Sequence, residues 1–316
     1  MKRFSSVLSR FWSFWVVGIL FGMLSAACVA ENTSAGRVSA ENRVTVGTNE
    51  QFRGPVGLQM YSFRSVAKED MDAAMKLAAE MGFQYIEASG FYDLSAEEYQ
   101  ALLEKYQLKA GAKNWGLGEF LTEEGLKKII HEAKVLDIKY VGIAWYPHKN
   151  GVFTYQDAQE AVTTFNRIGE RLKKEGLIFV YHNHGYEFYP WEGGKEGETL
   201  FDYMIQNTNP ECVAFEMDVL WTIFPGADPA TLLKKYPNRF RLMHLKDLKK
   251  GVEGNLSGGT PVENDVAIGS GQANYPEILK AAQEAGVEYY FIEDESPIFK
   301  TQVPKSLKYL ESVYWK

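Results

Sequence analysis

The feature that most constrains this chain is a regular alternation of short apolar runs and longer amphipathic stretches from Pro55 to the C-terminus. Short apolar runs are typical of buried parallel strands, and amphipathic stretches are typical of helices that cover them. Eight strands are predicted, at residues 56–61, 83–88, 108–113, 139–145, within 177–188, 212–219, 240–247 and 289–295. Helices are predicted at residues 67–81, 95–107, 122–136, 155–174, 198–206, 275–285 and 302–314, and another begins at Asp228-Pro229.

Eight strand-helix units over residues 55–316 match the number and size of a closed (β/α)8 barrel. We therefore predict an α/β fold, a single (β/α)8 TIM barrel, as the catalytic domain. A doubly wound open sheet is the alternative, but it needs a glycine-rich phosphate loop after its first strand. The residues at that place are Tyr61-Ser62-Phe63-Arg64, which do not form such a loop.

The first 30 residues have the pattern of a signal peptide. A basic start is followed by an apolar run over 11–27 and by small residues around Cys28 and Ala30. We expect an exported protein, either periplasmic or lipid-anchored to the cell envelope at Cys28, because residues 24–28 resemble a lipoprotein cleavage box with its leucine one place early. Cleavage after Ala30 and an uncleaved membrane anchor are the alternatives, and after processing we expect no membrane span.

Residues 31–54 are polar and end at Gly54-Pro55, so they are predicted to form a linker. The formal charge is −7, and removal of the three basic residues of the first 30 gives −10. This acidity argues against nucleic acid as a partner. Cys212 is the single cysteine of the predicted domain, which excludes a disulfide framework.

The stretch LIFVYHNHGYEF, residues 177–188, carries two histidines where an apolar strand ends. Side chains alternate along a strand, so His182 and His184 are predicted to point to the same side. We interpret the pair as one edge of a metal site. Structural histidines satisfied by hydrogen bonds are the alternative.

Polar residues gather at the ends of the four last predicted strands, where the active site of a (β/α)8 barrel lies. They are His182, His184, Glu216, Asp218, His244, Lys246, Asp247, Glu293, Asp294 and Glu295. Carboxylates and histidines that converge form a mixed oxygen and nitrogen shell, which favours Mn²⁺, Co²⁺, Fe²⁺ or Zn²⁺ over Ca²⁺ or Mg²⁺. A salt-bridged polar core without metal is the alternative.

Three ordered motifs resemble the xylose isomerase-like TIM barrel superfamily, also called the sugar phosphate isomerase/epimerase family. They are FEMD at 215–218 followed by GADP at 226–229, LMHLKD at 242–247, and GSG at 269–271 followed by Asn274-Tyr275 and Ile292-Glu293. The similarity extends from about Pro55 to the C-terminus. It implies one divalent metal ion held by Glu, Asp, His and Glu from strands five to eight.

Matched to that pattern, Asp218, His244 and Glu293 are the implied second, third and fourth ligands. Where relatives read Glu-Asn-His, this chain reads His182-Asn183-His184. Either His182 is the first ligand, which we expect, or Glu187 reaches the metal instead.

The resemblance implies removal of a proton next to a carbonyl, with Glu293 as both ligand and base. Lys246 is expected to polarise a carbonyl or carry a proton, with a pKa lowered by a nearby cation and partial burial. His184 is expected to act as a second acid or base, or else to bond a neighbouring strand end. Substrate contacts are expected from a further set of residues, namely Lys113, Asn114, Trp145, Glu187 and Trp221.

Relatives often carry histidines where this chain has Asn114 and Trp221, and no phosphate-binding cluster is evident. We therefore expect a metal-dependent isomerase or epimerase of a non-phosphorylated sugar. The alternative with the same site is a 3-keto-glycoside 1,2-lyase, which eliminates the aglycone. A barrel that binds carbohydrate without catalysis is the third hypothesis.

Overall fold

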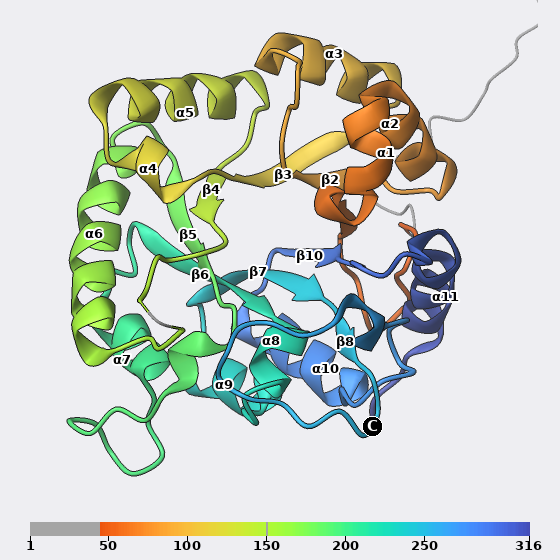
Figure 1. Cartoon of the computed structure of the whole chain (residues 1–316). Coiled ribbons are helices and arrows are strands. Elements are labelled where there is room, and N and C mark those ends of the chain that lie inside the picture. Colours follow the sequence, from red (N-terminus) through yellow and green to blue (C-terminus); the bar gives the residue numbers. More distant parts are fainter. Residues whose placement is uncertain (1–44, 150) are drawn as a thin grey trace, which may run out of the picture. The chain divides into compact units, whose positions relative to one another are not determined.

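The computed structural model describes residues 45–149 and 151–316, so the predicted signal peptide, Cys28 and most of the predicted linker lie outside the described residues. Within the described part, eight parallel strands close into a barrel in the order β1-β10-β7-β6-β5-β4-β3-β2 (Figure 1). The strands are β1 (Val56–Gln59), β2 (Tyr85–Ala88), β3 (Lys109–Asn114), β4 (Tyr140–Ile143), β5 (Ile178–His182), β6 (Val213–Asp218), β7 (Phe240–Leu245) and β10 (Tyr289–Ile292). The predicted (β/α)8 barrel is confirmed.

Helices surround the barrel (Figure 1). They are α1 (Arg64–Glu69), α2 (Met71–Glu80), α3 (Ala96–Lys105), α4 (Leu117–Phe120), α5 (Glu123–Val135), α6 (Tyr155–Lys173), α7 (Leu200–Asn207), α8 (Val219–Ile223), α9 (Pro229–Lys235), α10 (Tyr275–Ala285) and α11 (Phe299–Ser312). An antiparallel pair that the sequence analysis did not predict, β8 (Asp247–Leu248) with β9 (Asp265–Val266), follows β7. None of the helices in the described part of the chain is long and apolar enough to cross a membrane.

Local capping explains where several helices begin. Ser95 and Glu98 form a capping box at the start of α3, in which each side chain accepts a hydrogen bond from the other residue's backbone N–H. The helix predicted at 67–81 is instead two helices, because Asp70 adopts an extended conformation and accepts a hydrogen bond from the Ala73 N–H at 3.1 Å. An aspartate that caps a new helix in this way ends the previous one.

The side chains inside the barrel form two layers of different character. The apolar layer consists of Ala112, Tyr140, Val180, Ala214, Leu242 and Phe291. Two residues further along the strands, the same inward-facing positions are polar, as at His182 after Val180 and His244 after Leu242. In the strand register His182 pairs with Glu216, and Asp218 pairs with His244. The period of two along each strand therefore builds one continuous polar layer near the C-terminal ends of the strands.

The segment 45–54 belongs to the barrel domain, although we predicted a linker up to residue 54. Phe52 is fully buried and packs edge-on against Tyr290, with ring centroids 5.0 Å apart. The Asn49 side chain donates hydrogen bonds to the carbonyls of Leu310 at 3.0 Å and Val313 at 2.8 Å. The packed domain therefore begins before the predicted boundary at residue 55.

Replacement of Asn49 by alanine should destabilise the domain. Asn49→Ala removes the hydrogen bonds to the carbonyls of the last turn of α11 and of Val313, and should lower the free energy of unfolding by about 1–3 kcal/mol, measured by urea denaturation. Gln84→Ala is the control, since Gln84 is exposed and its side chain makes no hydrogen bond among the described residues. Equal effects of the two substitutions would contradict a stabilising role for the segment.

Candidate active site

A cavity of about 380 Å³, here called the mouth cavity, lies at the C-terminal ends of the strands. Its polar lining includes His182, His184, His244, Lys246, Asp265, Glu293 and Glu295. Aromatic side chains complete the wall on two sides, at Trp145 and Trp221, and the loop residues 259–262 border it. The residues expected to form the site thus come together at one end of the barrel.

Two histidines and one aspartate form a buried cluster at this cavity. Asp218 Oδ2 lies 3.8 Å from His182 Nε2 and 3.9 Å from His244 Nδ1. Asp218 is fully buried, and its Oδ2 has no hydrogen-bond partner among the described residues. A buried carboxylate oxygen without a partner is costly, so this atom indicates a place for a cation. Glu293 Oε2 lies 3.1 Å from His244 Nδ1 and adds a second oxygen.

The far nitrogen of each histidine faces a buried carboxylate. His182 Nδ1 lies 3.2 Å from Glu216 Oε2, and His244 Nε2 lies 2.5 Å from Glu87 Oε2. Glu216 Oε1 also lies 3.2 Å from His244 Nε2, without forming a hydrogen bond. A histidine that donates from one nitrogen to a carboxylate presents the other nitrogen as a lone pair, the usual arrangement of metal-bound histidine.

The donor set fits a divalent transition metal ion. His182 Nε2, Asp218 Oδ2 and His244 Nδ1 are close enough to bind one ion together, and Glu293 stands beside them. Two imidazole nitrogens with carboxylate oxygens suit Zn²⁺, Fe²⁺, Co²⁺ or Mn²⁺. Of the two alternatives that the sequence left open, this geometry favours His182.

The electrostatics of the buried carboxylates lead to the same conclusion. Burial raises the pKa of Asp218 to about 6. Burial together with the nearby Glu216 raises the pKa of Glu87 to about 7. Burial alone would lower the pKa of His244, but the carboxylates of Glu216, Glu87 and Glu293 outweigh it and hold this pKa well above its ordinary value. The layer thus contains an excess of carboxylates, which an added cation would balance.

The pKa of Lys246 is raised, whereas we expected it to be lowered. Its Nζ lies 2.5 Å from Glu295 Oε1, 3.3 Å from Glu293 Oε2 and 3.9 Å from Asp265 Oδ2. Burial lowers the pKa of Lys246, but these carboxylates outweigh burial and hold it well above its ordinary value. The expected lowering of this pKa was therefore wrong. Lys246 is a fixed cation in the mouth cavity, suited to stabilising negative charge.

His184 lies beyond the end of β5 and lines the mouth cavity. Its ring stacks on Trp221, with centroids 4.4 Å apart, and meets the edge of Trp145 at 5.0 Å. Burial lowers the pKa of His184 to about 3, so the imidazole is neutral near pH 7. Its Nδ1 is buried without a hydrogen-bond partner among the described residues. His184 is therefore separate from the metal cluster and has a free ring nitrogen.

Glu187 does not reach the mouth cavity or the metal cluster. Its carboxylate accepts hydrogen bonds from the His184 N–H at 3.0 Å and from the Tyr181 hydroxyl. It is fully buried and does not line either cavity described here. The structure therefore supports neither Glu187 as first ligand nor its expected contact with substrate. Glu187 instead stabilises the turn after β5.

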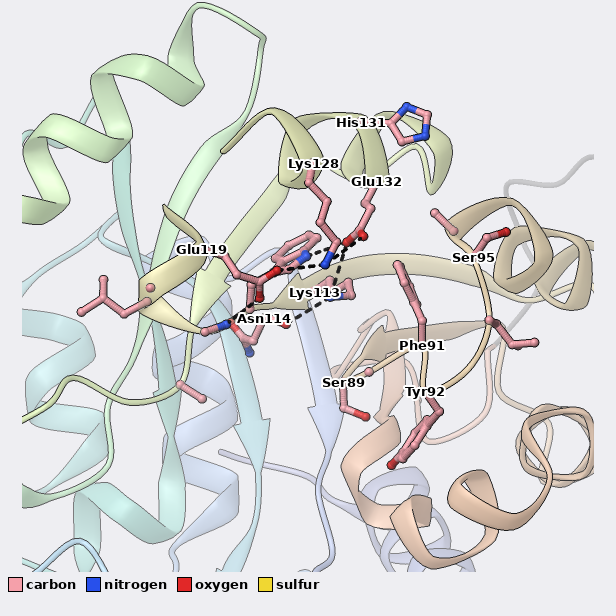
Figure 2. A pocket seen from close by; sticks show the side chains of 18 of the residues that line it. Ser89, Phe91, Tyr92, Ser95, Lys113, Asn114, Glu119, Lys128, His131 and Glu132 are labelled. Atoms are coloured by element: carbon pink, nitrogen blue, oxygen red, sulfur yellow. Dashed lines mark hydrogen bonds and ion pairs between the residues drawn. The ribbon is translucent and has the colours of Figure 1, made fainter. Parts of the chain in front are cut away.

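A second cavity of about 930 Å³, here called the side cavity, adjoins the mouth cavity (Figure 2). Lys113 lines the side cavity, whereas Asn114 and Trp145 line both cavities. Asn114 also donates a hydrogen bond to Glu87 Oε1 at 2.6 Å. The residues expected to contact substrate are thus divided between two neighbouring spaces.

Two buried glutamates support the site, and neither has a predicted role, although Glu216 is one of the polar residues expected at the strand ends. Glu87 is a lone acidic residue within the apolar run 83–88, and Glu216 stands two places before Asp218 on the same strand face. Each of these signals was present in the sequence. A charged residue inside an apolar strand is costly unless it is paired, so such a residue indicates a buried ion pair or a functional site.

Comparison with known proteins identifies the family. Residues 75–313 match the family model described as "Xylose isomerase-like TIM barrel". The chain belongs to this family. A sugar phosphate isomerase/epimerase of known structure from Parabacteroides distasonis is 26% identical, with a TM-score of 0.67, over 82% of this chain and 96% of that one.

Two other relatives extend the comparison. The chain is 27% identical over 181 residues to an inosose dehydratase of Geobacillus thermodenitrificans, over 55% of this chain and 59% of that protein. It spans about a third to three fifths of the curated relatives it matches. The crystal structure of the IOLI protein with a bound zinc atom has a TM-score of 0.64 at 15% identity, over 83% of this chain and 99% of that one, which shows a shared fold.

The buried Lys113 should make stability depend on pH. Burial lowers the pKa of Lys113 to about 8 from its ordinary 10.5, so its charged form carries a cost that is present below pH 8 and disappears as the pH rises to 10.5. The stability of Lys113→Met relative to wild type should therefore fall by up to about 3 kcal/mol between pH 7 and 10.5. Urea denaturation at several pH values measures this, and exposed Lys127→Met is the control. A constant difference would contradict the burial of a charged Lys113.

Proposed function

We propose that this barrel is a divalent-metal-dependent enzyme that removes a proton next to a carbonyl of a non-phosphorylated sugar or cyclic polyol. One observation carries the proposal: the unpartnered Asp218 Oδ2 lies between two histidine nitrogens, 3.8 and 3.9 Å away, beside the mouth cavity. A bound ion, held by His182, Asp218, His244 and Glu293, would act as a Lewis acid on the substrate oxygens.

Three side chains at the mouth cavity have separate roles in proton transfer and charge stabilisation. Burial would raise the pKa of Glu293, but Lys246 and His244 outweigh it and hold this pKa well below its ordinary value, so Glu293 is an ionised carboxylate able to accept a proton. Lys246 remains a cation and stabilises negative charge as it develops on the carbonyl oxygen. His184, a neutral imidazole on the wall of the mouth cavity, exchanges a second proton with the substrate.

A neutral substrate fits the charge of the mouth cavity. Lys246 is the single lysine among the residues that line the mouth cavity, and three carboxylates already lie within 4 Å of its Nζ. A phosphate group would need additional cations or free backbone N–H groups. The proposed substrate is therefore uncharged at the position that faces Lys246.

The carbanion formed by proton removal has two possible fates. Return of a proton to the same or a neighbouring carbon gives isomerisation or epimerisation, supported by the Parabacteroides relative. In elimination, the electron pair of the broken C–H bond forms a double bond to the next carbon, the C–O bond there breaks, and the leaving oxygen takes a proton. The dehydratase names of the sequence relatives and the adjoining side cavity favour elimination.

Deuterium exchange separates these outcomes. Metal-loaded protein is incubated in D₂O with free ketoses and, separately, with 3-keto-glucosides, and the products are followed by NMR. Deuterium in an intact skeleton indicates an isomerase or epimerase, whereas release of the aglycone indicates a lyase. If neither substrate exchanges deuterium or is cleaved, the proposed function is wrong.

The two neighbouring histidines should have different roles. His182→Ala removes a nitrogen of the ligand cluster and should reduce the metal content, measured by mass spectrometry of the purified protein, from about one ion per chain to near zero. His184→Ala should retain the ion and slow turnover by about 100-fold or more, the usual contribution of an acid or base. Equal metal loss in both variants would show that the assignment of His182 and His184 is wrong.

Glu216 should strengthen metal binding without touching the ion. Glu216→Gln keeps the side-chain shape but removes the charge behind His182 Nδ1, and metal affinity should fall by about 10- to 100-fold. Competition with a chelating dye measures this. Glu124→Gln, at an exposed position of α5, is the matched control. Unchanged affinity in Glu216→Gln would exclude the supporting role.

A further inference from the structure

The side cavity opens beside the mouth cavity and shares part of its wall. Ser89, Asn114, Ala144 and Trp145 line both spaces. The rest of the side cavity is formed by residues 89–97 after β2, by residues 113–119 at the end of β3 and in α4, and by the exposed side of α5 (Figure 2). Because the shared residues form a common edge, a ligand longer than one ring can extend from one space into the other.

Aromatic side chains line this path. Tyr92 and Trp145 are each 44% exposed, and Phe91 stands next to Tyr92 on the wall of the side cavity (Figure 2). Tyr92 has a φ angle of 55°, a left-handed conformation that is uncommon for tyrosine. Exposed aromatic rings offer flat faces on which the apolar face of a sugar ring stacks.

A buried ammonium group faces the same cavity. Lys113 is 5% exposed, and its Nζ lies 3.8 Å from the ring centroid of Trp115 and 4.6 Å from that of Phe91. It donates one hydrogen bond within the described residues, to the Asn114 carbonyl at 3.4 Å, and Glu132 Oε2 is 3.9 Å away. An ammonium group has three donors, so Lys113 has donors available for an oxygen of a ligand.

Each carboxylate on the wall of the side cavity has a basic partner. Lys128 lies 3.1 Å from Glu119 and 3.7 Å from Glu132, and His131 lies 2.9 Å from Glu97 (Figure 2 labels four of these). Glu132 also accepts a hydrogen bond from the Trp115 ring nitrogen at 2.7 Å. A wall of paired charges does not select an anion or a cation. Together with the stacking faces it suits an uncharged ring that carries hydroxyl groups.

We propose that the side cavity binds a second, uncharged, hydroxylated ring, joined by a glycosidic oxygen to the carbonyl-bearing ring in the mouth cavity. The substrate class is then a keto-glycoside with two rings. This inference rests on the proposed function for the identity of the first ring. In the elimination described above, the second ring departs as an alcohol, since its oxygen keeps the electrons of the broken C–O bond and takes a proton.

A blocking substitution tests the side cavity without altering the metal cluster. Gly118 lines the cavity within α4, and a Cβ atom added there meets no atom within 4 Å. Gly118→Trp should therefore fold and fill part of the space. Leu121→Trp is the matched control, because Leu121 ends the same helix, is 48% exposed and does not line the cavity.

The decisive quantity is the ratio of kcat/KM for 3-keto-cellobiose, which has two rings, to that for methyl 3-keto-glucoside, which has one. Gly118→Trp should lower this ratio at least tenfold, while Leu121→Trp should leave it within twofold of wild type. A ratio that stays within twofold in Gly118→Trp would overturn the proposal.

Equilibrium binding separates failure of this inference from failure of the proposed function. Unoxidised cellobiose is titrated into wild type and both variants by calorimetry. If neither keto-glucoside is turned over and free ketoses exchange no deuterium, the proposed function fails, yet cellobiose binding that is weakened at least tenfold by Gly118→Trp alone still supports the side cavity. Absence of cellobiose binding to wild type, or equal binding to all three proteins, overturns it.

Discussion

The burial of negative charge inside the barrel is the constraint on which the rest of the site depends. Glu87, Glu216, Asp218 and Glu293 are all at most 8% exposed, and they lie directly above an apolar layer that cannot solvate them. Charges taken out of water are costly unless they are paired. His244 and Lys246 supply part of the compensation, and the unpartnered Asp218 Oδ2 shows that it is incomplete. A bound cation would complete it.

The histidine at position 182 changes how this charge is distributed rather than removing it. A glutamate there would place a carboxylate among the ligands, whereas His182 places a neutral nitrogen towards Asp218 and directs its other nitrogen to Glu216. The carboxylate of Glu216 therefore lies behind the His182 ring and not beside the cavity. A carboxylate behind a histidine orients the ring and makes its free nitrogen a better donor. This arrangement explains how the chain can depart from the ligand pattern that the resemblance implies and still have a cluster that could hold a metal ion.

The parts of the site that sequence could predict are those with a local signal. The apolar alternation predicted the barrel, and the ordered motifs that carry the family resemblance implied Asp218, His244 and Glu293 as ligands. The sequence marks Glu87 as a charged residue inside an apolar strand but does not indicate its partner, because its contact with His244 crosses the closed barrel from β2 to β7. The pKa of Lys246 depends in part on Asp265, which lies in the unpredicted β8-β9 pair. Glu187 is close to His184 in sequence, but the turn after β5 directs its carboxylate to the backbone.

The two cavities are formed by different parts of the chain. The cluster that can hold a metal comes from β5, β6, β7 and the end of β10, and its ligands are supported by one another and by the register of these strands. The side cavity is built by the end of β3, by the segments after β2, β3 and β4 and by one side of α5, and exposed aromatic rings and the buried Lys113 line it. Loops can vary in sequence while strands preserve the reacting geometry. In the reaction we propose, the fate of the common carbanion then depends on what these loops hold beside the reacting carbon: with the side cavity empty the proton returns, and with a leaving group bound there the C–O bond breaks.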